Sequence, residues 1–262
     1  MSRGDRGVQA RLRSVATGGK STVHGSLLVG CDGHGSTVRK QASVRWESRP
    51  YGESFSIADF EDRTDLGGDA HLFFTRYGAI ESFPLPGRRR RWIAQTDAGS
   101  DPLTCQNLVD CVYLRTGYHL DADDAKELSW FRPERLCCRH FADERVLLCG
   151  DAAHVMSPIG GQGMNTGFAD ADLAARAIAR WLRGEYWSGL REEYTRKRSR
   201  AFNVAADRAA VGMWVGTRRG AASRLRSALL RYVALRGPVR DYLPLHFSML
   251  TIPHARPPAA GI

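Results

Sequence analysis

Residues 145–171 read RVLLCGDAAHVMSPIGGQGMNTGFADA, and this stretch decides the fold. Its first five residues form a short apolar run, which predicts a buried strand. The strand delivers Gly150 and Asp151 to the carboxyl end of a sheet, where open α/β folds bind their ligands. A carboxylate in that position can accept a hydrogen bond from a sugar or ribityl hydroxyl. We therefore expect a ligand site that begins at Asp151.

The loop that follows this strand is rich in glycine, with Gly160, Gly161 and Gly163 between Pro158 and Met164. Glycine lacks a Cβ atom, so this backbone can lie directly against a flat ligand. A helix that begins near Met164 or Asn165 would aim free N–H groups and a partial positive charge at the same ligand. His154, inside the sequence GDAAH, is more simply a packed structural residue than a proton carrier.

A second unit of the same kind lies about 120 residues upstream. Residues 26–31 (SLLVGC) predict a buried strand, and Asp32, Gly33 and Ser36 follow it at the start of an expected helix. Read alone, this pattern is weak. Between the two units, residues 51–97 are short aromatic or β-branched segments separated by Gly, Pro and Asp, which predicts an antiparallel sheet.

The two glycine units together resemble a known family. Residues 145–171 resemble the GD motif of the para-hydroxybenzoate-hydroxylase-like FAD-dependent monooxygenases (group A, related to ubiquinone hydroxylases), and residues 28–39 resemble the DG motif of that family. The resemblance covers residues 11–200. It implies that Asp151 contacts the FAD ribityl chain and that Asp32, Gly33 and Arg39 serve FAD and the nicotinamide cofactor. The implied cofactor-binding set is completed by Gly150, Pro158, Gly160, Gly161, Gly163, Met164 and Asn165.

The resemblance also implies the domain organisation. We expect an α/β fold in which residues 1–47 and 142–184 form a partial, Rossmann-like FAD-binding domain of the glutathione-reductase type. Residues 48–141 would form an inserted antiparallel sheet that covers the substrate, and residues 185–262 a C-terminal helical region. No G-x-G-x-x-G follows a strand before Leu27, although the family opens with that motif in a unit of roughly 30 residues. The chain is therefore expected to be an N-terminally truncated homologue.

The implied reaction uses FAD, NADH or NADPH, and dioxygen. A flavin hydroperoxide would hydroxylate an aromatic, phenolic or quinone-like substrate. No residue stands out as the catalytic base, and the aromatic side chains of the sheet are more simply core than ring-binding groups: Phe74, Tyr77, Phe83 and Trp92. Two alternatives stay open. One is a flavin halogenase or prenyl-chain reductase on the same fold, although no W-x-W-x-I-P string is present; the other is a non-catalytic homologue that does not retain FAD.

The net charge of +10 is concentrated in residues 190–240, which hold thirteen Lys and Arg against three acids. A helix over residues 223–236 would place Leu225, Leu229, Tyr232 and Val233 on one face with arginines around it. Such a helix usually packs on its own domain, and peripheral membrane contact through residues 190–240 is the alternative. No nucleic-acid-reading motif accompanies the charge, so we expect no nucleic-acid partner.

Three further features of the sequence concern its localisation, its cysteines and a run of arginines. No run of 18 apolar residues and no secretory signal is found, so we expect a cytoplasmic protein. The six cysteines show no paired spacing, which predicts reduced structural thiols and no metal site. The run of residues 88–91 (RRRR) beside Gly87 predicts a solvated hairpin turn.

Overall fold

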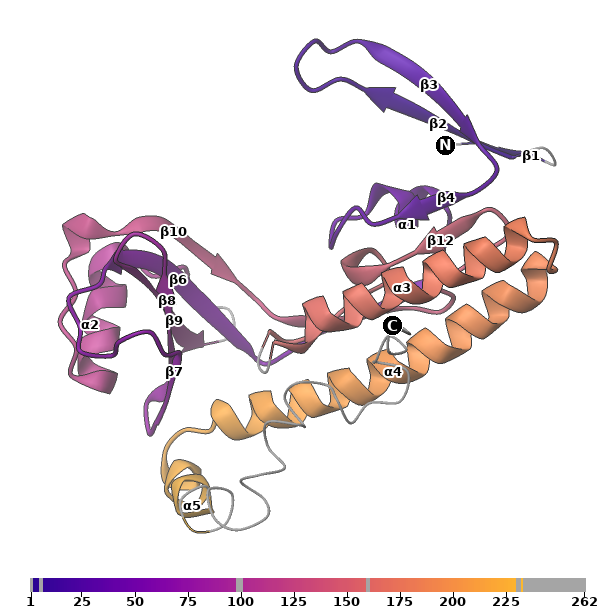
Figure 1. Ribbon diagram of the computed structural model, residues 1–262. Helices are drawn as coiled ribbons and strands as arrows, with labels where there is room; N and C mark the ends of the chain where they lie inside the picture. Colours follow the sequence, from indigo (N-terminus) through magenta and orange to yellow (C-terminus); the bar gives the residue numbers. More distant parts are fainter. Residues whose placement is uncertain (1, 5–6, 98–100, 159–160, 230–231, 233–262) are drawn as a thin grey trace, which may run out of the picture. The chain divides into compact units, whose positions relative to one another are not determined.

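The computed structural model describes residues 2–4, 7–97, 101–158, 161–229 and 232. It contains two compact units (Figure 1). Unit 1 comprises Met1–Arg49, Glu134–Ala209 and Leu245–Ile262, and unit 2 comprises Pro50–Pro133 and Ala210–Pro244. The predicted α/β fold class, with an inserted antiparallel sheet and C-terminal helices, is confirmed.

The centre of unit 1 is a parallel pair of short strands, β4 (Leu28–Gly30) and β12 (Val146–Leu148). Strand β12 is apolar at every position because its three side chains are buried in the core. Gly30 is required where the strands meet the following helix, since a Cβ atom there would lie 2.8 Å from Leu148 Cδ2 and 2.9 Å from Val38 Cγ1. The strands point the same way, so both glycine loops leave from one edge.

The remaining elements of unit 1 surround this pair. A meander of β1 (Ser2–Gly4), β2 (Gly7–Arg13) and β3 (Lys20–Gly25) precedes it, and β5 (Trp46–Pro50), β11 (Glu134–Cys138) and β13 (His154–Val155) form a second small sheet. Helix α1 (Thr37–Gln41) and the 3₁₀ turn η2 (Gly150–Ala152) follow β4 and β12. Helices α3 (Gln162–Leu182) and α4 (Trp187–Gly216) supply much of the apolar core, although the part of α4 from Ala210 onward belongs to unit 2.

Unit 2 is built on a five-stranded antiparallel sheet in the order β10-β6-β9-β8-β7. Its strands are β6 (Glu53–Glu61), β7 (His71–Thr75), β8 (Gly78–Leu85), β9 (Arg89–Asp97) and β10 (Lys126–Phe131). Helix α2 (Cys105–Thr116) packs its buried Leu108, Val109 and Val112 against one face of this sheet. The unit also contains the turn η1 (Ala122–Asp124) and helix α5 (Ala221–Leu229).

The prediction of a solvated turn over residues 88–91 is wrong for most of that run. The chain turns at Gly87 and Arg88, which both have positive φ, and β9 begins at Arg89. Arg90 is fully buried because its guanidinium binds the Asp62 carboxylate at 2.9 Å together with carbonyl groups of a loop of residues 67–69. Arg89, Arg90 and Arg91 therefore begin an interior strand, and Arg88 alone lies in the turn.

The amphipathic face expected for the helix over residues 223–236 is also wrong for the residues of this segment that the structure describes. Leu225 is exposed, whereas Arg226 is buried and donates hydrogen bonds to the carbonyl groups of Gly216, Arg218 and Phe74. Carbonyl groups at the end of α4 and on β7 attract the guanidinium inward. Of the other residues named for that face, Leu229 has no described side chain and Val233 lies outside the described residues, whereas Tyr232 is exposed.

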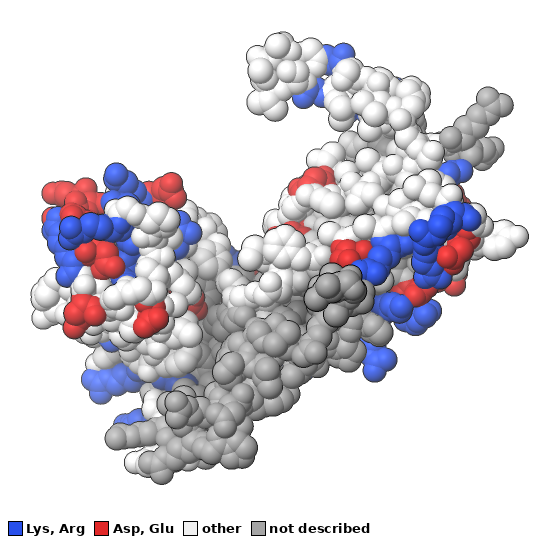
Figure 2. All heavy atoms as spheres, viewed as in Figure 1, with Lys and Arg blue, Asp and Glu red and all other residues white. Residues whose placement is uncertain are grey.

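Basic and acidic side chains are mixed on the face of the molecule that Figure 2 shows. Arginines of residues 190–240 pair with acids outside that stretch: Arg191 with Asp143, Arg198 with Asp170 and Arg219 with Asp97. These acids neutralise part of the basic excess of residues 190–240. None of the helices in the described part of the chain is long and apolar enough to cross a membrane.

Candidate functional site

The loop after β4 is held by the Asp32 carboxylate. Its oxygens accept hydrogen bonds from Ser36 Oγ at 2.5 Å and from the backbone N–H of Val38 at 3.0 Å. Ser36 is the N-cap of α1 and accepts a bond from the N–H of Arg39, the pattern that favours serine at a helix start. Gly33 turns the loop with a φ of 77°, which favours glycine.

Burial raises the pKa of Asp32, but the hydrogen bonds from Ser36 and Val38 outweigh it and hold that pKa below its ordinary value. The carboxyl group is therefore ionised at neutral pH. It sits on the exposed side of the loop. In this state Asp32 offers only acceptor oxygens, which suits a ligand with hydroxyl or amide N–H groups.

Arg39 joins the two glycine units. Its guanidinium is buried, and it donates from Nη1 to the backbone oxygens of Ala152 at 3.0 Å and Asp151 at 3.3 Å. Nη2 donates to the backbone oxygen of His34 at 2.6 Å. The same side chain lies over the ring of Trp46, 5.1 Å from its centroid. One cation thus fixes the loop after β4 against the turn after β12.

The turn after β12 exposes its carboxylate. Gly150 has a φ of 58° and begins η2, and the side chain of Asp151 is exposed next to it. Pro158 is exposed at a bend, whereas Gly160 lies outside the described residues. Helix α3 begins at Gln162, two or three residues before the expected start near Met164 or Asn165. Gly161, in the left-handed conformation with a φ of 63°, is its N-cap and thereby sets this earlier start.

The N-terminus of α3 has the shape of a binding surface. Gly161 and Gly163 leave open space, since a Cβ atom on Gly161 would meet nothing within 4 Å and one on Gly163 would only touch Met156 Cγ at 3.9 Å. Met164 and Asn165 are exposed on the first turn. The N-cap Gly161 has no side chain to cap the helix, and the first turn of α3 carries no acid. The site therefore presents a flat glycine surface and free N–H groups.

A buried charged cluster that the sequence analysis did not predict holds Gly150 and the first turns of α3 in place. The Asp170 carboxylate, on α3, accepts hydrogen bonds from the N–H of Gly150 at 2.8 Å, from His154 Nε2 at 2.6 Å and from Arg198 Nε. All three side chains are almost completely inaccessible to solvent. The predicted packed position of His154 is confirmed, because its ring also stacks between Phe141 and Phe202.

Burial raises the pKa of Asp170, yet its bonds with His154 and Arg198 prevail and keep that pKa below the ordinary value. Arg198 also donates to the backbone oxygen of Thr166, so it ties α4 to the first turns of α3. Gly167 lies close to Gly150: a Cβ atom on Gly167 would be 3.2 Å from the Gly150 Cα atom. One signal for this cluster exists in the sequence, namely the acid Asp170 at helical spacing between Thr166 and Ala174 on the buried face of α3.

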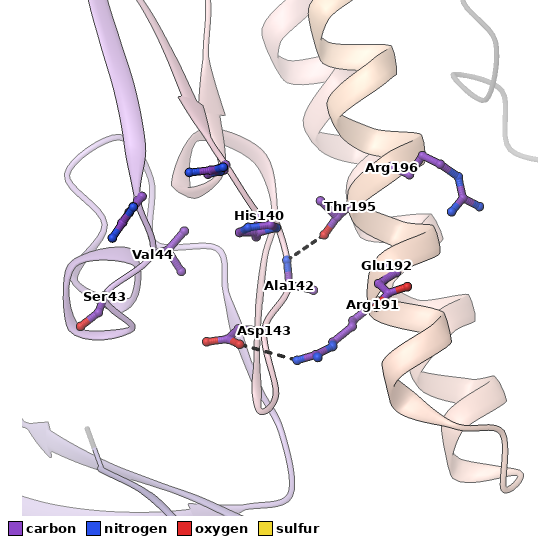
Figure 3. Close-up of a pocket in the computed structure, with 11 residues that line it drawn as sticks. Ser43, Val44, His140, Ala142, Asp143, Arg191, Glu192, Thr195 and Arg196 are labelled. Carbon is purple, nitrogen blue, oxygen red and sulfur yellow. Dashed lines mark hydrogen bonds and ion pairs between the residues drawn. The ribbon is translucent and has the colours of Figure 1, made fainter.

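A separate pocket of about 640 Å³ lies in unit 1, between the loops that follow α1 and β11 and the first turns of α4 (Figure 3). Arg191 pairs with Asp143 at 3.7 Å across it, and Thr195 Oγ1 accepts a hydrogen bond from the N–H of Ala142. An adjoining pocket is lined by Trp46, Arg135 and Asn203 among others. Neither pocket is lined by residues of the two glycine motifs, so both are distinct from the glycine surface.

The glycine surface fits a flavin. The side chain of Gln162 is buried, and its Oε1 has no hydrogen-bond partner among the described residues, which suits a site that a polar ligand completes. Asp151 and Asp32 offer carboxylate oxygens to hydroxyl groups, and Gly161 and Gly163 leave room for a flat ring. These residues would hold the ribityl chain and the isoalloxazine ring of FAD.

Comparison with known proteins agrees with this geometry. The family model described as an FAD binding domain matches residues 1–209. Over 172 residues the chain is 33% identical to ubiquinone hydroxylase UbiL from Rhodospirillum rubrum, covering 60% of this chain and 38% of that protein. Over 200 residues it is 34% identical to 6-methylpretetramide 4-monooxygenase from Streptomyces rimosus, covering 74% of this chain and 35% of that protein.

Among solved structures, OxyS anhydrotetracycline hydroxylase from Streptomyces rimosus superposes with a TM-score of 0.76 at 25% sequence identity. The superposition covers 100% of this chain and 52% of that chain. The chain spans less than half the length of the two curated relatives and about half of this structural relative.

Proposed function

Because the chain belongs to the FAD binding domain family, we propose that it acts as an FAD-dependent monooxygenase that hydroxylates an aromatic, phenolic or quinone-like substrate. The observation that carries this proposal is the position of Arg39, which joins both glycine motifs at one edge of the β4–β12 pair. The names of the relatives support the substrate class, since they include a ubiquinone hydroxylase, a pentachlorophenol monooxygenase and an aklavinone hydroxylase.

Each part of the site has a task in this proposal. Asp151 and Asp32 would bind hydroxyl groups, and the glycines of residues 161–163 would lie along the ring. The N-terminus of α3 would stabilise negative charge at the ring edge facing it. Bound FAD would supply the oxidative chemistry, with NADH or NADPH as reductant and dioxygen as the oxygen source. The Asp170 cluster would keep Gly150 and the first turns of α3 in place.

The test is product formation by the full chain loaded with FAD. Oxygen consumption and NADH or NADPH oxidation are measured with simple phenols and quinones, and isotope-labelled dioxygen shows whether one oxygen atom enters the ring. We expect consumption that depends on the aromatic substrate and a labelled hydroxylated product. A chain that holds FAD but shows neither would contradict the monooxygenase proposal while leaving the flavin site intact.

A further inference from the structure

Strand β8 places one carboxyl group on the face of the unit 2 sheet that α2 does not cover. The α2 face is defined by Ile80, Trp92 and Ala94, which pack against the helix. Side chains alternate along a strand, so Glu81 points to the opposite face. In the sheet register Glu81 lies directly between Leu72 of β7 and Ile93 of β9.

The residues directly opposite Glu81 on the two adjacent strands are apolar, whereas Arg91 and Gln95 lie diagonally from it on the same face of β9. Ile93 is paired in turn with Ile57 of β6, and Phe83 follows Glu81 on the same side of β8. The Glu81 side chain is 8% exposed, and no hydrogen bond or ion pair with another described residue satisfies it. Burial raises the pKa of Glu81 to about 7. A carboxyl group held in this way costs stability, which is characteristic of groups that serve a ligand.

The other charged groups near this face are already engaged. They pair with one another or with backbone oxygens: Asp59 with Arg91, Asp97 with Arg219, Glu53 with Thr217, Arg115 with the carbonyl groups of Ala79 and Gln95, and Arg226 with those of Phe74 and Thr75. The fifth strand adds Glu127, which pairs with Arg91 at 3.7 Å and whose side chain is 77% exposed. Among the described residues, Glu81 is thus the carboxyl group of this face that stays available to a ligand.

We propose that Glu81 binds a hydroxyl group of the aromatic substrate and accepts its proton, while Leu72, Ile93 and Phe83 contact the ring. This inference rests on the proposed function. In the transfer the substrate O–H bond breaks and a carboxyl O–H bond forms on Glu81, with no change in oxidation state. The ring oxygen gains electron density, which activates the carbon atoms of the ring toward an electrophilic oxygen.

The Glu81 role also explains why one row of this sheet has a single charged position. The row runs from Leu72 through Glu81, Ile93 and Ile57 to Ser129 of β10. Apolar side chains give contact area without direction, whereas one carboxylate fixes the orientation of a ring that carries a hydroxyl group. Ligands that lack the hydroxyl group leave the carboxylate unpaired and are therefore disfavoured.

The test measures binding of 2-naphthol to the full chain by fluorescence, with naphthalene as the ligand that lacks the hydroxyl group. Phenols ionise near pH 10, so between about pH 5 and 8 the ligand stays neutral while Glu81 ionises. For the wild type we expect 2-naphthol affinity to rise roughly tenfold over this range, the effect of one hydrogen bond to a charged group. Glu81→Gln should abolish the rise, Glu127→Gln should keep it, and naphthalene affinity should not depend on pH.

A Glu81→Gln variant with the wild-type pH profile for 2-naphthol would overturn the role of Glu81 and leave aromatic binding in place. If the wild type bound neither ligand at any pH, the proposed function would itself be contradicted, and the Glu81 inference with it. Glu81→Leu provides a second variant of similar volume, for which the same loss of pH dependence is expected. Thermal unfolding of each variant establishes that it is folded.

Discussion

The guanidinium of Arg39 lies 3.0 Å from the backbone oxygen of Ala152, although the two residues are 113 positions apart. This bond and its partner to Asp151 unite two strand–glycine–helix units that the sequence separates by the whole sheet of unit 2. Arg39 therefore has a structural task in addition to any contact with a cofactor.

We expect Arg39→Met to lower the free energy of unfolding by about 3 kcal/mol, because three backbone oxygens would lose a charged donor in a buried place. Arg45→Met is the matched control, since Arg45 is exposed. Urea denaturation measures both. Equal stability of the two variants would show that Arg39 does not hold the loop after β4 and the turn after β12 together.

The Asp170 cluster predicts an acid-sensitive fold. The pKa of Asp170 is below its ordinary value in the folded chain, so its stabilisation is present above about pH 4 and disappears as the pH falls. Asp170→Asn should lower the free energy of unfolding by about 3–5 kcal/mol at neutral pH, the effect of breaking a buried ion pair. The loss should shrink in acid.

Asp172→Asn serves as the control for Asp170→Asn, because Asp172 pairs with Arg176 on the exposed side of the same helix. It should change stability by no more than about 0.5 kcal/mol. Denaturation curves at neutral and acidic pH compare the two variants. A loss of stability in Asp170→Asn that does not depend on pH would speak against an ionised Asp170.

The pH dependence of stability that Glu81 contributes has the opposite sign to that of Asp170. Its pKa rises from 4.5 to about 7 on folding, so the folded chain favours the protonated form. The free energy of unfolding should be highest below about pH 4.5 with respect to this group and should fall by roughly 3 kcal/mol as the pH rises toward 7. Glu81→Gln should remove this contribution and be more stable than the wild type at pH 8. Identical pH profiles for both proteins would contradict the burial of an unpaired carboxyl group.

Substitutions at two glycines of α3 distinguish a residue that contacts the ligand from a residue that is needed for packing. Gly163→Ala creates only an ordinary contact, so we expect it to raise the free energy of unfolding by about 0.5 kcal/mol through helix propensity and yet to weaken FAD binding. Gly167→Ala would press on the Gly150 backbone at 3.2 Å and should lower that free energy by about 1–3 kcal/mol. Thermal unfolding and FAD titration together measure the two effects. Unchanged FAD affinity in a stable Gly163→Ala protein would place the ring elsewhere.

The strands and loops of unit 1 follow from local sequence. The apolar run before Gly150 has its three strand residues buried in β12, and the glycine loops must leave the carboxyl ends of β4 and β12. The start predicted for α3, near Met164 or Asn165, lies two or three residues after the observed one, because the left-handed conformation of Gly161 depends on the backbone path of the loop.

Long-range burial explains what the sequence could not predict. Arg90 looked like a residue of a solvated turn, since its partners Asp62 and Gly67 lie more than twenty residues away in the chain. The burial of Asp170 on α3 likewise depends on its ion pair with Arg198, which comes from α4. The alternation along β8 shows that Ile80 and Glu81 face opposite sides, but only the position of α2 decides which side is covered.

The central claim is that the edge where β4 and β12 end holds a flavin, and flavin binding by the full chain tests it most directly. Visible absorption and fluorescence are followed during titration with FAD and with riboflavin, which carries the ring and ribityl chain alone. We predict that both flavins bind, that Asp151→Asn weakens both about tenfold, as loss of a hydrogen bond to a charged group would, and that Asp172→Asn binds as the wild type does. Absence of any spectral change with either flavin, or equal affinity of Asp151→Asn and Asp172→Asn, would contradict the account.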